Sequence, residues 1–103
     1  MSDPLHIEIS ALAAAHVRAA ETWWQLNRPA APGAIRDELE RASSLIAFQP
    51  HIGTRARNVA LPGVRRLHLA RIRYDLYYRL VDMPRRLEIL AFWHASRDSQ
   101  PPI

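Results

Sequence analysis

Cysteine and lysine are both absent from the 103 residues, and each absence removes a class of chemistry. Without cysteine, the chain has neither disulfides nor thiolate chemistry. Without lysine, it has no lysine general base, no Schiff-base former and no ammonium group to hold a phosphate. All fourteen basic residues are therefore arginines, which bind anions but rarely give up a proton. Against ten acidic residues they leave a formal charge of +4, which suits nucleic acid, a nucleoprotein or an acidic protein as partner.

Long apolar runs and known site motifs are missing too. No stretch reaches the roughly 18 apolar residues of a membrane span, and the N-terminus lacks the layout of a secretory signal, so we expect a cytoplasmic protein. The sequence contains no glycine-rich phosphate loop and no nucleophile elbow. Its five histidines are scattered, so we expect neither a metal site nor a cofactor. The length and the 49% apolar content predict one domain over residues 1–103.

Alternation of apolar and polar residues predicts strands, mainly in the segment 64–97. The pattern gives one strand around Leu67 and Leu69, a second over 74–81 and a third over 87–94. The third is apolar on both faces, which is typical of a central strand covered on both sides. A shorter alternation over 5–9 predicts an N-terminal strand.

Two amphipathic helices are predicted between these strands. Ser10 can cap a helix over 11–26, and a second helix should end before Pro50 and Gly53. We place the apolar stripe of the first helix at Leu12, Ala19, Trp23 and Leu26. Adjacent helix positions diverge by about 100°, so Trp24 then points away from the core and becomes a candidate partner contact. The fold class is α+β: a strand, an antiparallel helical hairpin and a three-stranded antiparallel sheet.

One face of the sheet is the candidate functional surface. If every strand keeps its register, Ile89 and Trp93 face the helices, and the opposite face carries basic and aromatic side chains: Arg66, His68, Tyr77, Arg79, Leu90, Phe92 and His94. Such a face can bind RNA, with arginines on phosphates and rings on bases, or an acidic, amphipathic protein segment. It can also be an ordinary solvated sheet. Further arginines follow nearby in sequence, and we add three of them to the candidate contacts: Arg65, Arg71 and Arg73.

Several segments together resemble the RelE/ParE superfamily of bacterial type II toxins. They are WWQLNRPAAPGAI, LIAFQPHIG, GVRRLHLARIRYDLYYRL and LEILAFWHASR, and the similarity extends from Leu5 to about Arg97. The most specific parts are the Pro50–Gly53 step, the strand RYDLYYR and the closing Trp-His-x-x-Arg. The resemblance implies the strand, helical hairpin and C-terminal sheet expected above. It also implies a cognate antitoxin, acidic in character, whose C-terminal segment wraps over the toxin and would cover Tyr77, Leu90 and Phe92.

The same resemblance implies two alternative activities. ParE-like members inhibit DNA gyrase, whereas RelE-like members cleave messenger RNA on the ribosome. In a ribonuclease, Arg66, Arg79 and Arg97 would hold the phosphate and His94 would transfer a proton. Lysine is absent and no carboxylate base accompanies this set. We favour the gyrase-directed alternative because the hairpin WWQLNRPAAPG and the strand RYDLYYRL look more like ParE-type plasmid-stabilisation toxins, and this choice rests on the resemblance. A toxin fold that serves only as a binding module is a third possibility.

Overall fold

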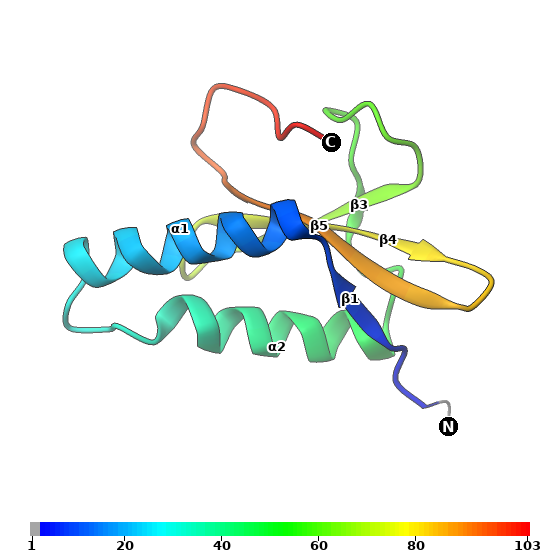
Figure 1. Ribbon diagram of the computed structural model, residues 1–103, viewed down its shortest axis with the longest axis horizontal. Coiled ribbons are helices and arrows are strands. Elements are labelled where there is room, and N and C mark those ends of the chain that lie inside the picture. The colour runs from blue at the N-terminus through cyan, green and yellow to red at the C-terminus, as the bar shows by residue number, and fades with distance from the viewer. Residues whose placement is uncertain (1–2) are drawn as a thin grey trace.

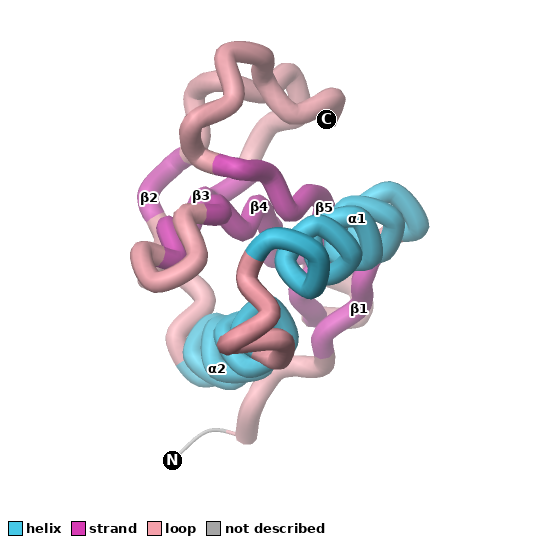
Figure 2. Tube along the Cα trace, turned by 90° about the vertical axis from the view of Figure 1, so that its left-hand side faces the viewer, coloured by secondary structure: helices cyan, strands magenta, loops and turns pink. Residues whose placement is uncertain are grey.

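The computed structural model describes residues 3–103, which form a strand, two helices and four further strands (Figure 1). The elements are β1 (Ile7–Ile9), α1 (Ala11–Asn27), α2 (Ala34–Phe48), β2 (Thr54–Arg55), β3 (Val64–Leu69), β4 (Tyr74–Val81) and β5 (Arg86–His94). The helices run antiparallel to each other on one side of the sheet (Figures 1 and 2). The α+β class, the N-terminal strand and the helical hairpin are thus confirmed.

All five strands join one sheet in the order β1-β5-β4-β3-β2, so the prediction of a three-stranded sheet is wrong. β1 pairs in parallel with β5, and β2 adds two residues beside β3. The three predicted strands are the antiparallel centre of this larger sheet. Local alternation could not show the two additional pairings, because each depends on contacts between segments that are distant in sequence or very short.

The ends of the helices follow the local signals. The Ser10 hydroxyl accepts a hydrogen bond from the Ala13 N–H at 3.0 Å, which caps α1 as predicted. α2 ends at Phe48, ahead of Pro50 and Gly53. Neither helix within residues 3–103 has the length and apolar character that crossing a bilayer requires.

The buried side of α1 lies one position away from the predicted stripe. Three small or medium residues and one partly buried tryptophan face the sheet: Ala13, Val17, Ala20 and Trp24. The predicted stripe stays outside, with exposed fractions of 39% for Leu12, 44% for Trp23 and 78% for Leu26. α1 therefore carries two apolar stripes. The stripe richer in buried alanine packs on the sheet, where small side chains allow close approach.

A bulge interrupts the pairing of β4 with β5. Tyr78 lies opposite Ile89, but Tyr77 lies opposite Ala91, so Leu90 is the additional residue. An additional residue reverses the alternation of every side chain that follows it in the strand. The predicted face assignment assumed an unbroken register and is therefore wrong for the last residues of β5.

Phe92 and Trp93 exchange faces as a result. Phe92 packs in the core beneath the helices and stacks on Tyr74, with ring centroids 4.7 Å apart and planes 9° apart. Trp93 packs instead on the opposite face of the sheet. Phe92 is 2% exposed, so the expectation that it contacts a partner at the surface is wrong.

The second face of the sheet is covered by the chain itself. Segment 56–61 and Ile103 pack over a buried cluster that includes Tyr77 and Leu90, and both views show the loop and the tail together (Figures 1 and 2). The Ala60 N–H donates to the Ile103 carbonyl at 3.0 Å. The predicted open surface over Tyr77 and Leu90, with room for an antitoxin segment, is therefore absent from this conformation.

Candidate functional site

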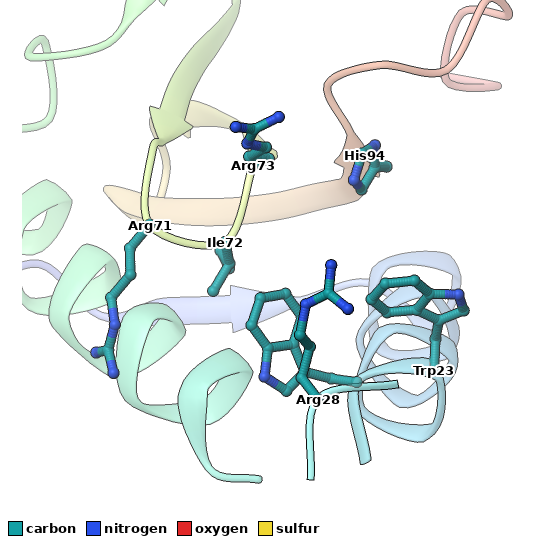
Figure 3. Close-up of a pocket in the computed structure, with 7 residues that line it drawn as sticks. Trp23, Arg28, Arg71, Ile72, Arg73 and His94 are labelled. Atoms are coloured by element: carbon teal, nitrogen blue, oxygen red, sulfur yellow. The ribbon is translucent and has the colours of Figure 1, made fainter. Parts of the chain in front are cut away.

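The candidate site is a cavity of about 450 Å³ at the end of the molecule where α1, the β3–β4 turn and β5 meet (Figure 3). α1 and the residue after it contribute Trp23, Trp24 and Arg28, the turn contributes Arg71, Ile72 and Arg73, and β5 contributes His94. A cavity of this volume falls in the range of small-molecule sites. Its lining combines two indole rings, three guanidinium groups and one imidazole.

The helical wall of the cavity is fixed by the end of α1. The Arg28 N–H donates to the Trp24 carbonyl at 2.7 Å as the helix ends. The Trp24 indole N–H donates to the Ala31 carbonyl at 2.8 Å while its ring packs against the core. Trp24 is thus a partly buried wall, and the prediction that it points away from the core is wrong. The exposed indole is that of Trp23.

The opposite wall is the turn between β3 and β4. The N–H groups of Ile72 and Arg73 both donate to the Leu69 carbonyl, at 3.2 and 2.8 Å, and Arg73 adopts a φ of 62°. Ile72 is 2% exposed and anchors the turn in the helix-side core. The two arginines on either side of Ile72 are consequently exposed at the cavity.

The guanidinium groups of the cavity are poorly neutralised. Arg28 lies 5.5 Å from the centre of the Trp23 ring and donates to the Asn27 carbonyl. Arg71 reaches Glu38 at a long 3.5 Å, and Arg73 has no carboxylate partner among residues 3–103. By contrast, Arg79 pairs with a carboxylate outside the cavity at 2.9 Å. No carboxylate lines the cavity, so its charge is available to an anion.

His94 contributes one further donor. Its Nδ1 accepts from the Ser96 backbone N–H at 3.2 Å and lies 2.7 Å from the Ser96 hydroxyl. Because Nδ1 is an acceptor, the neutral ring carries its proton on Nε2. The edge-on contact with Tyr74, with ring centroids 5.0 Å apart, holds the imidazole in this orientation.

A second hollow of about 280 Å³ continues the site along α1 and shares Trp23 and His94 with the first. The Arg97 guanidinium lies 4.0 Å from the centre of the Trp93 ring at its rim. His16 lines the same hollow, and its Nδ1 accepts from the Phe92 backbone N–H at 3.2 Å. Burial, and secondarily the positive charge of Arg97, lowers the pKa of His16 below its ordinary value.

The stability of the fold should therefore decrease as the pH falls below neutrality. The unfolded chain protonates His16 near pH 6.5, while the folded chain keeps this group neutral to a lower pH, so the unfolded state binds more protons in between. Protonation would also remove the acceptor for the Phe92 N–H. Urea unfolding at pH 7.5 and pH 5 checks this. The His16→Asn variant keeps an acceptor near the position of Nδ1 but has no group that titrates, so it should lose less unfolding free energy between pH 7.5 and pH 5 than the wild type. Replacing the exposed His51 by Asn should leave the loss of the wild type unchanged. Equal losses in wild type and His16→Asn would contradict the assignment.

The cavity unites four of the predicted site residues: Trp24, Arg71, Arg73 and His94. Arg65 lies elsewhere, with its guanidinium donating to the Gly53 carbonyl at 2.7 Å. Sequence reasoning did not include Trp23, Arg28 and Ile72 among the site residues. The sequence did contain a sign of two of them: Trp23 and Arg28 lie at the two ends of the segment WWQLNR, where an aromatic and a basic residue occur together at the end of a helix.

The predicted ribonuclease residues do not converge. Arg66 lies opposite Tyr77 in the ladder, and Arg79 lies two positions further along β4, so both project to the face that the loop covers. Arg79 is also paired with Glu88. His94 lies on the helix side of the sheet, beyond the bulge, and shares a hollow only with Arg97. A single phosphate could not contact all four side chains in this conformation.

Residues 3–103 contain no group of three His, Asp or Glu side chains close enough to hold a metal ion. What the site offers is several hydrogen-bond donors, positive charge and flat apolar surface. This combination can bind an anion that carries a planar or apolar group.

Comparisons with known proteins place this chain in a family. The model described as "ParE toxin of type II toxin-antitoxin system, parDE" matches residues 7–99. A solved structure described as the chromosomal ParDE TA system from P. aeruginosa superposes with a TM-score of 0.70 at 22% sequence identity. The alignment covers 92% of this chain and 100% of that chain, and at this identity it shows a shared fold. No curated protein sequence gives a significant match.

Proposed function

Because this chain belongs to the ParE toxin family of type II toxin–antitoxin systems, we propose that it inhibits growth by acting on DNA gyrase. The observation that carries this choice is the separation of the candidate ribonuclease residues. His94 lies on one face of the sheet, while Arg66 and Arg79 lie on the other. A ribosome-dependent nuclease would need its phosphate-binding and proton-transferring groups around one scissile bond. A toxin that acts by binding alone has no such requirement.

We assign the gyrase contact to the cavity between α1 and the β3–β4 turn. Trp23 is 44% exposed there, the Arg28 guanidinium lies 5.5 Å from the centre of its ring, and Arg73 lines the same cavity. Among the described residues, neither arginine has a carboxylate partner in the cavity. Tryptophan and arginine are the residues that most often dominate binding energy at protein interfaces. Removing water from an arginine side chain costs less free energy than removing it from lysine, because a guanidinium group is more weakly hydrated than an ammonium group.

A cognate antitoxin is the partner that membership of this family implies. With the back of the sheet already covered, we propose that the antitoxin lies along the exposed stripe of α1 defined by Leu12, Trp23 and Leu26. Exposed alanines, Ala15 and Ala19, separate these large residues and would let a helix approach closely. Two arginines lie at the edges of this stripe: Arg28 beside the Trp23 ring and Arg97 beside the Trp93 ring. Their positive charge favours an acidic segment. Because Trp23 belongs to both surfaces, antitoxin bound there would also close the cavity.

A supercoiling assay with purified gyrase and relaxed plasmid tests the proposal. The toxin should block supercoiling and leave a gyrase–DNA cleavage complex. Arg73→Gln should raise the inhibitory concentration about tenfold, which corresponds to about 1.4 kcal/mol. Arg41→Gln, an exposed arginine of α2, is the matched control. Leu26→Ser should raise the amount of antitoxin that restores supercoiling by a similar factor, whereas Phe48→Ser should not.

Unaffected supercoiling with folded toxin would exclude gyrase as the target. Codon-phased cuts in ribosome-bound transcripts, lost in a His94→Ala variant, would then favour the ribonuclease alternative. Harmless expression without antitoxin would favour a binding module.

A further inference from the structure

We propose that the cavity of Trp23, Arg28, Arg71, Arg73 and His94 binds a nucleotide, with the base on the indole surfaces and the phosphate on the guanidinium groups. The nucleotide can be a free nucleoside phosphate or a residue of a DNA strand, since both present the same base and phosphate. The inference deepens the proposed function by assigning a ligand to the same site. Binding is measured on the toxin alone, so each proposal can fail without the other.

The charge of the cavity fits a phosphate. Three arginines line it, and within residues 3–103 only Arg71 among them has a carboxylate partner, Glu38 at 3.5 Å, which leaves a net charge of +2. A phosphate monoester carries a charge of about −1.5 to −2 at neutral pH and offers three acceptor oxygens. Arginines bind such a group through paired N–H donors. The Nε2–H of His94 adds a donor at the wall formed by the end of β5.

The apolar part of the cavity fits a base. Trp24 is immobilised by its hydrogen bond to Ala31 and by the core, so its ring offers a fixed surface. The Trp23 ring lies 6.1 Å from it at an angle of 60°, and the Arg28 guanidinium lies against Trp23 (Figure 3). Stacking a base on an aromatic ring contributes about 1–3 kcal/mol, and a guanidinium plane can serve in the same way.

The shape of the cavity favours a nucleotide over an acidic peptide. A peptide needs partners for its backbone N–H and C=O groups, usually a free strand edge or a long groove. The cavity residues lie in a helix end, a closed turn and the end of β5. β1 pairs only with Leu87–Ile89, and beyond it the Phe92 N–H of β5 already donates to His16 Nδ1 at 3.2 Å. Its lining is rich in donors, which suits an oxygen-rich anion better than a peptide backbone. A volume of about 450 Å³ accommodates one nucleotide.

Calorimetric titration of the full chain with adenosine 5′-monophosphate tests the inference, with adenosine and inorganic phosphate as separate ligands. The nucleotide should bind at least tenfold more tightly than either part. Arg73→Gln and Trp23→Ser should each weaken binding at least tenfold. The matched exposed controls Arg41→Gln and Phe48→Ser, outside the cavity, should leave it unchanged, and circular dichroism verifies that all four variants are folded.

A short single-stranded oligonucleotide and a glutamate-rich peptide complete the experiment. Tighter binding of the oligonucleotide than of the mononucleotide would identify a DNA strand as the source, and equal binding would identify the free nucleotide. Three results would overturn the inference: phosphate binding as tightly as the nucleotide, the acidic peptide binding where the nucleotide does not, or equal losses in the Arg73 and Arg41 variants. None of these results depends on whether the toxin inhibits gyrase.

Discussion

Phe92→Ala should lower the free energy of unfolding by about 3–5 kcal/mol, whereas Trp93→Ala should lower it by about 1–2 kcal/mol. The bulge at Leu90 is the reason, because it turns Phe92 into the core and Trp93 to the other face. Removing the Phe92 ring leaves a cavity beneath the helices and exposes the stacked Tyr74 ring. Trp93 is only partly buried, with its indole N–H donating to the Ser99 carbonyl at 2.9 Å.

Urea unfolding followed by far-ultraviolet circular dichroism measures both losses. Phe92→Leu, which keeps most of the volume, is the control and should cost less than about 1.5 kcal/mol. An unbroken register would predict the opposite ranking, with Trp93 as the core residue. A larger loss for Trp93→Ala than for Phe92→Ala would therefore contradict the bulge.

Gly53→Ala should cost about 2–4 kcal/mol, through overpacking and the loss of buried hydrogen bonds. A Cβ at this position would lie 2.9 Å from the Arg66 carbonyl oxygen and 2.9 Å from the Tyr78 hydroxyl oxygen. The Tyr78 hydroxyl donates to the Pro50 carbonyl at 2.9 Å and accepts from the Gly53 N–H at 3.0 Å. Burial raises the pKa of Tyr78, so the hydroxyl stays protonated and keeps this donor role. The loop between α2 and β2 is thus fastened to the sheet at a point where only glycine fits.

Two further variants serve as controls for Gly53→Ala. Gly33→Ala should cost less than about 1 kcal/mol, because its Cβ would meet only the flexible Asp37 side chain, at 3.8 Å. Tyr78→Phe removes one atom of the clash together with two hydrogen bonds, so the cost of the double variant should be less than the sum of the single costs. Urea midpoints at constant slope give these values. Additive costs would show that the added methyl group does not press on Tyr78.

The sequence by itself determined those features that depend on neighbouring residues. The alternation in 64–94 predicted the three central strands, and the Ser10 cap and the apolar periodicity predicted the helical hairpin. The strand Tyr74–Val81 is joined to the strands before and after it by short turns, so their antiparallel pairing follows from the sequence order. The absence of lysine and cysteine and the excess of arginine also belong to the sequence alone, and they favoured a partner that presents anionic groups.

The tertiary structure decided everything that depends on which surfaces meet. α1 offers two apolar stripes, and only packing on β5 selected the one with Ala13 and Ala20 and left Trp23 outside. The bulge at Leu90 results from the pairing of β4 with β5, and a single additional residue moved Phe92 and His94 to the helix side. Side-chain periodicity is a local property, whereas register and burial are set by contacts between distant segments. The cavity owes its three walls to such contacts.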